Sequence, residues 1–596
     1  MVKAPIRVVV VGDRGTGKST LILTAAEQSF PINVQPVLPP TTLPEDFFPD
    51  CVPITIIDTS SCVADDYKVA EELKRADAVV ITYACDDPTT LDRLGIFWLP
   101  KLCKLEVKAP VILVGCKLDL RDPNQKVSLE KMMSPIMGQF QHIGTSMECS
   151  AIQLIQTRDA FYLAQTAVLH PKGPLLDNMA LLPRCHRALK RIFILCDHDK
   201  DGALSDAELN AFQVKLYDAE FKPSEIVGIK RLVAKELPEG VNDLGLTLMG
   251  FLYLHVLFLR NGHPEVIWTV LRKFGYNNDV KLAEDLIPSF KRAPDQSVEL
   301  TNEAIEFLRG IVASVAGDDG ELGPHAIDDI FSTAAESPWE TEQYAAAVQK
   351  NVYSLDGFLS MWAFMTLVDP ALSMENMICL DYPGDPSSAF RFTRERHLAC
   401  SKQQTDRNVF QCVVFGAKKA GKSALLNSFV GRRFSDEYAS TIEDHYAVNI
   451  VNEPCGAKKT LVLREIPEGV SELLLDKESL AACDVAVFVH DSSNAFSWER
   501  ATEFLEEVAS HGKDTGFEVP CLIVAAKYDL GLFPMAKQNY DWVSGRMGIE
   551  APIPISTKLG NLNHVFRTIV SAAEHPHLSI PKTEAAGRVA AEHSTP

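Results

Sequence analysis

Hydrophobic and polar positions along the chain follow one pattern near its two ends and another in between. Residues 6–11 (IRVVVV) and 411–415 (QCVVF) are mostly apolar runs, each followed by a glycine-rich turn and a helical pattern. Such runs are typical of strands that are buried on both faces of a parallel sheet. In the middle of the chain, apolar residues recur at helical spacing. The pattern therefore predicts α/β domains near both ends and an all-α region between them.

The first glycine-rich turn, GDRGTGKST at residues 12–20, fits the phosphate-binding pattern GxxxxGK[ST] between a strand and a helix. We expect Lys18 to reach the β- and γ-phosphates and the Ser19 hydroxyl to ligate Mg²⁺. Asp58, at the end of the run ITIID, is expected to hold Mg²⁺ through water. These three residues are the predicted catalytic residues of this domain. The predicted nucleotide contacts are Gly12, Gly15, Gly17, Lys18, Ser19 and Thr20.

A second loop of the same kind, GAKKAGKSA at residues 416–424, follows the second apolar run. Lys422 and Ser423 are expected to have the same catalytic roles toward phosphate and Mg²⁺. The predicted nucleotide contacts of this loop are Gly416, Gly421, Lys422, Ser423 and Ala424.

Two later segments predict which base is bound. VILVGCKLD (111–119) and CLIVAAKYD (521–529) are each a buried strand that ends in x-K-x-D. Asp119 and Asp529 are expected to accept hydrogen bonds from N1–H and the 2-amino group of guanine, which adenine does not offer. This argues against an ATP-driven motor or kinase. A third segment, ECSA at 148–151 and ISTK at 555–558, follows each of these strands and is also expected to contact guanine. The predicted base contacts are Lys117, Asp119 and Ser150, and Lys527, Asp529, Ser556 and Thr557.

Residues 197–208 (DHDKDGALSDAE) match the calcium loop of an EF-hand at each diagnostic position. Gly202 occupies the sharp turn and Ser205 the position that acts through water. A solvated acidic loop is the alternative, but it would not explain so many carboxylates in one short segment. The predicted calcium ligands are Asp197, Asp199, Asp201, Ala203 through its carbonyl, and Glu208.

EF-hands normally occur in pairs, and residues 315–326 (VAGDDGELGPHA) are the best second loop. Val315 and Ala326 occupy positions where calcium ligands are needed, so we expect a hand that keeps its structure and binds no calcium. Residues 245–279 and 353–385 share the cores GFLYLHVLF and GFLSMWAFM. This similarity indicates an internal duplication, in which each stretch is a loop-degenerate hand packed on its neighbour.

Composition narrows the functional classes. The net charge of −21 over 596 residues argues against a nucleic-acid-binding protein. The 14 cysteines are scattered, which argues for a reducing compartment without disulfides or a zinc site. The longest apolar run, residues 248–259, is too short to span a bilayer, and the N-terminus lacks a signal peptide. We expect no membrane anchor in this sequence and a disordered polar tail.

Several residues depart from the usual GTPase pattern. Ser61 stands where a glycine would contact the γ-phosphate, and Cys62 stands where a glutamine would orient water. Arg14 occupies a loop position that is usually small, where it would either crowd a partner or stabilise the transition state. Cys116 and Ala526 replace the asparagine of the two base motifs.

The C-terminal domain departs further. Thr441 is the predicted switch threonine on Mg²⁺, and Thr41 or Thr42 is its weaker counterpart in the N-terminal domain. Glu465 stands where aspartate is expected, and Glu468 where glycine is expected. We therefore expect nucleotide binding with unusual or slow hydrolysis there.

CKLDLRD at 116–122 resembles the corresponding motif of Rho-family GTPases, although their charged insertion helix is missing. The order of GTPase, two EF-hand units and GTPase, together with GFLYLHVLF…WTVLRKFGY, resembles the Miro family of mitochondrial Rho GTPases over residues 6–580. The segment LKRIFILCDHDKDGALSDAELN is similar in sequence to plant members of this family. The resemblance implies a cytosol-facing place on the mitochondrial outer membrane, roles in mitochondrial distribution, morphology and inheritance, and protein adaptors of organelle transport or contact sites. Family members end in a transmembrane helix, which this sequence does not contain.

We therefore predict a multidomain fold with two α/β P-loop GTPase domains flanking an all-α tandem EF-hand region. The predicted segments are an N-terminal GTPase domain (1–170), a first EF-hand unit (175–295), a second EF-hand unit (296–400), a C-terminal GTPase domain (408–580) and a tail (581–596).

The leading functional hypothesis is a calcium-responsive GTPase switch and adaptor that hydrolyses GTP to GDP and phosphate and binds Mg²⁺ and Ca²⁺. In this hypothesis the nucleotide state and calcium bias how the domains dock, and a protein partner reads the result. The alternative is a nucleotide-binding scaffold with little or no hydrolysis, which is regulated mainly by calcium. It rests on Ser61, Cys62, Glu465 and Glu468.

Overall fold

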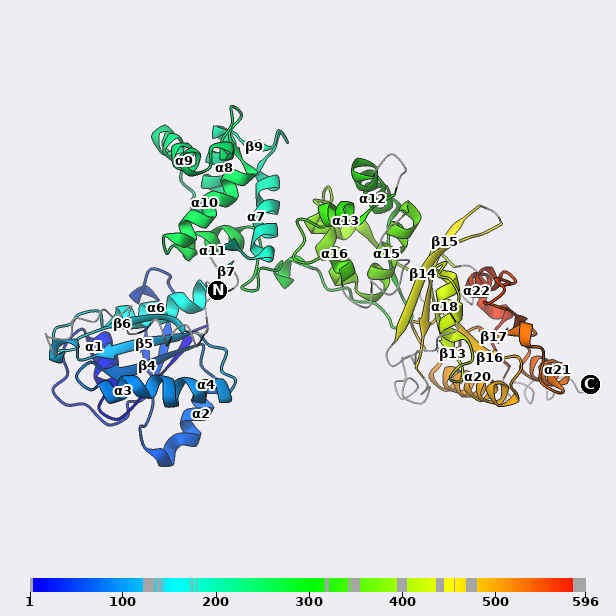
Figure 1. Ribbon diagram of the computed structural model, residues 1–596, viewed down its shortest axis with the longest axis horizontal. Coiled ribbons are helices and arrows are strands. Elements are labelled where there is room, and N and C mark those ends of the chain that lie inside the picture. Colours follow the sequence, from blue (N-terminus) through cyan, green and yellow to red (C-terminus); the bar gives the residue numbers. More distant parts are fainter. Residues whose placement is uncertain are drawn as a thin grey trace, which may run out of the picture. The chain divides into compact units, whose positions relative to one another are not determined.

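The computed structural model describes residues 4–121, 133, 136, 140, 143–171, 173, 175–177, 180–316, 321–340, 344, 354–393, 405–435, 444–454, 456–467 and 480–582. The chain divides into two compact units, Met1–His186 with Cys196–Val280 and Arg187–Leu195 with Lys281–Pro596. Figure 1 shows the elements of each unit.

The N-terminal domain is built on a six-stranded sheet in the order β2-β3-β1-β4-β5-β6. β2 is antiparallel to β3, and the other neighbouring strands are parallel. The strands are β1 (Ile6–Gly12), β2 (Thr41–Leu43), β3 (Ile54–Asp58), β4 (Ala78–Ala84), β5 (Val111–Cys116) and β6 (Ile143–Glu148). The helices are α1 (Lys18–Glu27), α2 (Asp66–Lys74), α3 (Pro88–Arg93), α4 (Leu99–Lys104) and α6 (Asp159–Leu169).

Strand β1 is buried on both faces, as its uninterrupted valines predict. Val8 and Val10 pack in one core cluster, with residues of α1 and α6. Val9 and Val11 pack in a second cluster, with residues of α2 and α4. Because both faces are covered, the phosphate-binding turn that follows β1 is held at the carboxyl edge of a rigid sheet.

The first helical region pairs the predicted calcium loop with a second hand. Strands β9 and β10 are antiparallel, with Leu204 opposite Leu246 and Ala203 opposite Thr247. The calcium loop thus pairs with the stretch 245–279. The elements are β7 (Leu176–Asp177), β8 (Ala180–Leu181), α7 (Pro183–Cys196), β9 (Ala203–Leu204), α8 (Asp206–Tyr217), α9 (Pro223–Glu236), β10 (Leu246–Thr247), α10 (Leu248–Arg260) and α11 (Pro264–Lys273).

The second unit contains another helical region and another α/β domain. The helical region consists of β11 (Val298–Leu300), α12 (Asn302–Val315), α13 (Pro324–Ile330), α15 (Leu355–Val368), α16 (Pro370–Cys379) and β12 (Phe390–Phe392). α15 and α16 repeat the pattern of α10 and α11, as the duplicated sequence predicts. β11 and β12 form an antiparallel pair.

The C-terminal domain repeats the sheet of the N-terminal domain, in the order β14-β15-β13-β16-β17-β18 with β14 antiparallel. The strands are β13 (Val409–Phe415), β14 (His445–Asn452), β15 (Lys458–Glu465), β16 (Val485–Asp491), β17 (Cys521–Ala526) and β18 (Ile553–Pro554). The helices are α18 (Lys422–Phe429), α20 (Ala495–Thr515), α21 (Ala536–Met547) and α22 (Val565–Glu574). The predicted fold class, two α/β domains flanking a helical region, is confirmed.

A buried polar network joins β11 to the start of the C-terminal sheet. The Glu299 carboxylate, only 2% exposed, accepts hydrogen bonds from the backbone N–H groups of Asn408 (2.9 Å) and Val409 (3.0 Å). Arg407 pairs with Asp484, and both side chains are buried. The network fixes the direction in which the chain enters β13.

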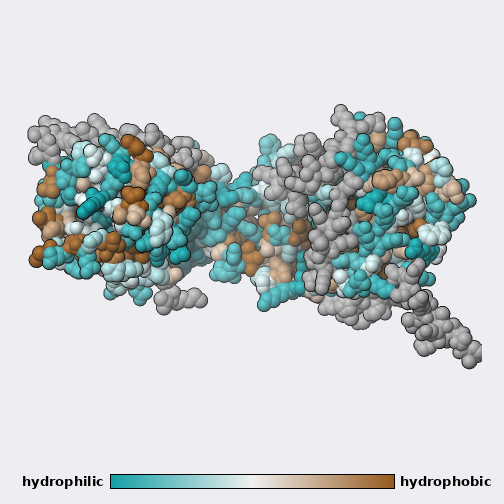
Figure 2. All heavy atoms as spheres, turned by 90° about the horizontal axis from the view of Figure 1, so that it is seen from below, coloured by the Kyte–Doolittle hydropathy of each residue, from teal (hydrophilic) through white to brown (hydrophobic). Residues whose placement is uncertain are grey.

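The surface mixes residue types, and on the face seen in Figure 2 hydrophilic and hydrophobic residues are interspersed. Within the described part of the chain, no helix has both the length and the apolar character needed to cross a membrane. α10 is the predicted apolar helix, and its 13 residues are partly buried in the helical region.

Candidate nucleotide and calcium sites

The N-terminal phosphate loop has the backbone that anion binding requires. Gly12, Gly15 and Gly17 have φ angles of 150°, 82° and 98°, a region that favours glycine. A Cβ on Gly12 would lie 2.3 Å from Thr82 Oγ1, so a larger residue does not fit. Lys18 begins α1, and its Nζ donates to Gly12 O (2.9 Å) and Asp13 O (3.2 Å). These hydrogen bonds hold the phosphate loop folded around the Lys18 side chain.

Lys18 also donates to Ser61 Oγ at 2.6 Å, so the unusual serine lies at the phosphate loop, as its sequence position suggested. Burial lowers the pKa of Lys18, although Asp58 and Asp13 oppose this shift. Cys62, by contrast, is exposed. Arg14 is also exposed.

The predicted magnesium residues of the N-terminal domain lie together. Ser19 Oγ donates to Asp58 Oδ2 at 2.5 Å, and Leu38 N–H donates to the same oxygen at 3.0 Å. A hydroxyl beside a carboxylate is a set of hard oxygen donors that fits Mg²⁺. Thr41 and Thr42 lie in β2, where Thr41 Oγ1 donates to Pro39 O. The role of either threonine as the switch residue stays a prediction.

The base-reading residues of the N-terminal domain converge at the ends of β5 and β6. Ser150 Oγ donates to Asp119 Oδ1 at 2.6 Å. Lys117 has a left-handed φ of 60°, and its Nζ lies 3.3 Å from Asp86 Oδ2. The serine hydroxyl orients the aspartate, while the lysine is directed across the strand ends toward β4.

The C-terminal domain repeats this geometry. Ser556 Oγ donates to Asp529 Oδ1 at 2.6 Å, and Lys527, with φ of 55°, pairs with Asp491 Oδ2 at 2.7 Å. Burial alone would raise the pKa of Asp491, but hydrogen bonds, including that from Lys527, lower it below its ordinary value. Thr557 follows Ser556 in the same turn, and its carbonyl accepts from Gly560 N–H. Two different sequences thus produce the same arrangement of the predicted base-reading residues.

Asp86 and Asp491 belong to these sites although no sequence motif predicts them. Both residues follow or end the strand beside the base motif, β4 in one domain and β16 in the other. The shared position after an apolar run, in ACDD and VHDS, is the signal that was available.

The C-terminal phosphate loop resembles the first one. Gly416 and Gly421 have φ angles of 150° and 109°. Lys422 Nζ donates to Gly416 O at 2.8 Å and to Ala417 O at 3.4 Å. Thr20 and Ala424 occupy equivalent positions, one residue after the serine, in α1 and α18.

The longer side chain of Glu465 reaches the position that Asp58 occupies in the first domain. Ser423 Oγ donates to Glu465 Oε1 at 2.9 Å, and His445 Nδ1 lies 3.4 Å from the other carboxylate oxygen. Glu465 is 2% exposed. The sequence analysis did not identify His445, which lies directly opposite Glu465 on β14. Thr441 and Glu468 lie outside the described residues.

The calcium loop brings part of its predicted ligand set together. One carboxylate oxygen from each of Asp197, Asp199 and Glu208 lies within 4.8 Å of the others. The Asp201 carboxylate accepts from Ala203 N–H at 2.9 Å, inside the same turn. Gly202 has φ of 85° and donates to Asp197 Oδ2. The oxygen donors and the turn fit Ca²⁺.

Glu208 also stabilises the end of the calcium loop, where the loop meets α8. Its carboxylate accepts from Ser205 N–H (3.0 Å), Ser205 Oγ (2.9 Å) and His198 N–H (2.7 Å). Burial alone would raise the pKa of Glu208, but these hydrogen bonds lower it below its ordinary value, which favours the anionic carboxylate. Ser205 and Glu208 together form the capping box of α8. Ser205 therefore has a structural role in addition to its predicted contact through water.

The second loop, 315–326, differs from the first. Val315 ends α12, Ala326 lies in α13, and Leu322 is fully buried. Residues 317–320 lie outside the described residues. The described positions offer packing rather than a set of ligands, and the prediction that this loop binds no calcium stays a prediction.

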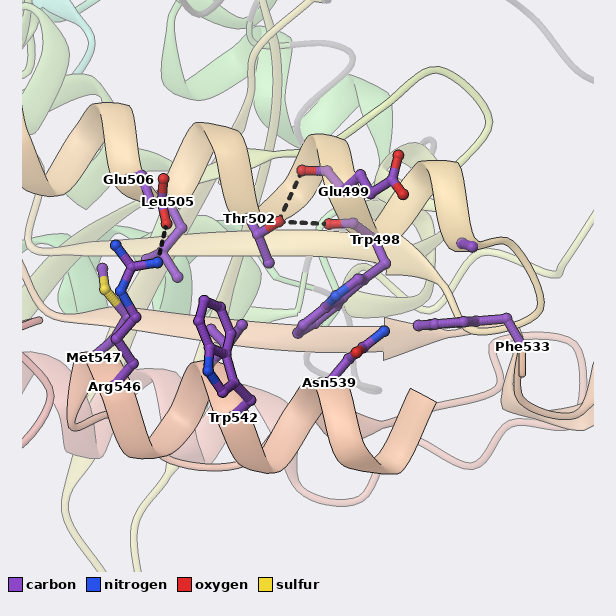
Figure 3. Close-up of a pocket in the computed structure, with 12 residues that line it drawn as sticks. Trp498, Glu499, Thr502, Leu505, Glu506, Phe533, Asn539, Trp542, Arg546 and Met547 are labelled. Carbon is purple, nitrogen blue, oxygen red and sulfur yellow. Dashed lines mark hydrogen bonds and ion pairs between the residues drawn. The ribbon is translucent and has the colours of Figure 1, made fainter. Parts of the chain in front are cut away.

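A cavity of about 250 Å³ lies between α20 and α21 of the C-terminal domain (Figure 3). Trp498 and Phe533 are buried in it, and Trp542 stands at its edge, 61% exposed. Arg546 bridges the two helices through Glu506 at 3.2 Å. None of the residues that line this cavity is a predicted nucleotide or metal contact.

These features define a class of protein: a chain with two GTPase-type α/β domains on either side of an EF-hand region. The Ras family model matches residues 7–170 and 411–570, and two models described as EF hand associated match residues 219–304 and 339–404.

The relatives are more specific. Mitochondrial Rho GTPase 1 of Arabidopsis thaliana is 60% identical over 589 residues, covering 97% of this chain and 91% of the relative. Mitochondrial Rho GTPase 2 of the same plant is 53% identical, covering 98% and 92%. Mitochondrial Rho GTPase 1 of Cryptococcus neoformans is 34% identical, covering 97% and 91%. The chain belongs to the mitochondrial Rho GTPase (Miro) family.

Proposed function

We propose that the chain is a calcium-responsive GTPase switch and adaptor, which hydrolyses GTP to GDP and phosphate at the mitochondrial outer membrane and acts in mitochondrial distribution, morphology and inheritance. The observation that carries the nucleotide part is the pair of base sites, in which Asp119 and Asp529 are each held by a serine at 2.6 Å. The names of the relatives support the mitochondrial part.

Each base site selects guanine by hydrogen-bond complementarity. The oriented carboxylate accepts from N1–H and the 2-amino group of guanine, whereas adenine would leave it unpaired. The lysine stem covers one face of the purine. Selection is therefore a property of three side chains on two neighbouring loops, and it occurs twice in the chain.

The phosphate loop of the N-terminal domain binds the rest of the nucleotide. Backbone N–H groups of the loop surround the β-phosphate, and Lys18 exchanges its contacts with Gly12 O and Ser61 for phosphate oxygens. Ser19 and Asp58 would hold Mg²⁺, which neutralises charge that develops on the phosphates. These groups orient the nucleotide for attack by water.

The calcium loop is proposed to make the switch respond to a second signal. Asp197, Asp199 and Glu208 would bind Ca²⁺, and Glu208 also belongs to the capping box of α8, whose N-cap is Ser205. Calcium would therefore act on α8, which follows the loop, and on β9, which lies inside the loop and pairs with β10. Protein adaptors of organelle transport or contact sites are the proposed partners.

A second candidate is a scaffold that keeps its nucleotide without hydrolysis. Lys18 is bonded to Ser61, and the exposed Cys62 lacks the amide with which a glutamine would orient water. In the C-terminal domain the buried Glu465 replaces aspartate. These features favour slow turnover.

Single-turnover cleavage of bound GTP distinguishes the two. The switch predicts release of phosphate from the purified chain, with the N-terminal contribution abolished by Lys18→Asn, whereas Lys108→Asn on the surface leaves it unchanged. GTP that is still intact on the protein after prolonged incubation, identified by chromatography of the extracted nucleotide, would instead support the scaffold.

A further inference from the structure

Two buried thiols lie side by side beneath the base site of the N-terminal domain. Cys116 ends β5 and Cys149 follows β6, and their Sγ atoms are 3.9 Å apart. The side chains are 4% and 1% exposed. Cys149 N–H donates to Gly115 O at 2.7 Å, which continues the parallel ladder past the strand end. Neighbouring strands lie about 4.8 Å apart, within the roughly 4.4–6.8 Å range of Cα separations that a disulfide spans.

The two cysteines adjoin both base-reading loops and the phosphate loop. Leu118 N–H donates to Cys149 O at 3.0 Å, so the two base-reading loops are joined at the cysteines. Cys116 Cβ lies 3.3 Å from where a Cβ of Gly17 would stand, so this side chain also packs on the phosphate loop. A change in the distance between the two sulfurs would therefore displace Asp119, Ser150 and the phosphate loop.

We propose that Cys116 and Cys149 form a reversible disulfide that weakens the hold of the N-terminal domain on guanine nucleotide. The effect on nucleotide rests on the function proposed above, while the disulfide itself does not. The oxidant is a peroxide. The hydrogen bond with Cys149 and burial raise the pKa of the Cys116 thiol, so a thiol must first lose its proton. The thiolate that forms attacks the O–O bond of the peroxide, giving a sulfenic acid and hydroxide. The second thiolate then attacks that sulfur and displaces a second hydroxide. Two protons and two electrons leave the thiols, and one hydrogen peroxide becomes two waters.

The geometry predicts the direction of the effect. A disulfide shortens the sulfur–sulfur distance from 3.9 Å to about 2.0 Å. Rotation of the two cysteine side chains supplies part of this change, and the remaining adjustment of the strand ends acts on the 2.6 Å hydrogen bond between Ser150 and Asp119 in the loops that follow them. Losing one charge-assisted hydrogen bond to the base corresponds to about tenfold faster release.

The second domain of the same chain provides an internal control. Ala526 and Ile555 occupy the positions that correspond to Cys116 and Cys149, immediately before Lys527 and Ser556. The base-reading geometry is the same, with Ser556 bonded to Asp529 at 2.6 Å. Peroxide should therefore leave nucleotide release from this domain unchanged.

The test uses the full chain with Lys422→Asn, so that fluorescent GDP reports the N-terminal domain, and the reciprocal Lys18→Asn chain for the other domain. After hydrogen peroxide and catalase, digestion without reductant and mass spectrometry should show a peptide that links Cys116 to Cys149. Label release should be about tenfold faster in the N-terminal domain, unchanged in the C-terminal domain, and restored by dithiothreitol.

The cysteine variants separate the linkage from general oxidation. Cys116→Ser and Cys149→Ser should each abolish the linked peptide and the faster release, whereas Cys85→Ser should keep both. Absence of the linked peptide from the wild-type chain overturns the site, and a linked chain with unchanged release overturns its role. If the untreated chain binds no GDP, the proposed function itself fails, and the linked peptide still reports on the disulfide.

Discussion

At the scale of residues, the two GTPase-type domains reach similar sites with different side chains. Asp58 and Glu465 both accept a hydrogen bond from the serine of their phosphate loop, at 2.5 and 2.9 Å. The extra methylene of Glu465 is accommodated because His445 meets its second oxygen. An altered residue in a motif therefore does not mean a lost site.

Glu208 is the residue on which the calcium prediction can be tested most simply. Calorimetry should detect one calcium site per chain, and Glu208→Lys should abolish it, because a cation replaces a carboxylate of the Asp197–Asp199–Glu208 cluster. Asp218→Asn, at the far end of α8, is the control and should retain the site. Two tight sites in the unmodified chain would show that residues 315–326 also bind calcium.

At the scale of elements, the close approach of β9 and β10 depends on a glycine. A Cβ on Gly245 would lie 2.0 Å from Leu204 O, so the strands could not pair at their observed spacing. This pairing joins the calcium loop to the loop-degenerate hand at residues 245–279. The β9–β10 contact therefore contributes to the stability of the fold and also fixes the conformation of the calcium loop.

Gly245→Ala should lower the free energy of unfolding by about 1–3 kcal/mol and weaken calcium binding, because the backbone of β9 must move. Gly228→Ala in α9 has open space around it and should instead stabilise by about 0.5–1 kcal/mol. Chemical denaturation followed by far-UV circular dichroism measures both. Equal stability of the two variants would mean that the strand pair is not closely packed.

The elements also show how far the sequence could be interpreted alone. Local patterns were enough to locate the turns of the phosphate loops, the base aspartates and the calcium loop, because each is a short segment, while their binding roles stay predictions. Sequence patterns did not predict Asp86, Asp491 and His445, since these side chains meet the sites only through strand neighbours that lie far away in sequence. The partner of the calcium loop was ambiguous for the same reason: Leu246 lacks any ligand signature.

At the scale of the whole molecule, the chain carries the same six-stranded sheet twice. In the unit that contains the second sheet, the connection between helical region and α/β domain is polar and buried. Arg407 and Asp484 side chains are each 6% exposed, and Arg407 also donates to Asp295 O. Such a pair makes the relative position of the two parts specific rather than merely favourable.

Removing Arg407 should destabilise this unit strongly. Arg407→Ala leaves the buried Asp484 carboxylate without its partner and should cost about 3–5 kcal/mol. Lys458→Ala breaks an exposed ion pair to Asp356 in the same unit and should cost at most about 1 kcal/mol. Differential scanning calorimetry of the two variants measures the difference. A small cost for Arg407→Ala would show that water replaces the arginine.

The most direct test of the account is competition between guanosine and adenosine diphosphates for the purified chain. The oriented carboxylates of Asp119 and Asp529 predict at least about hundredfold tighter binding of GDP than of ADP. The double variant Asp119→Asn, Asp529→Asn should lose this preference and gain affinity for xanthosine diphosphate, whose 2-oxo group accepts where guanine donates. Equal binding of GDP and ADP by the unmodified chain would contradict the account.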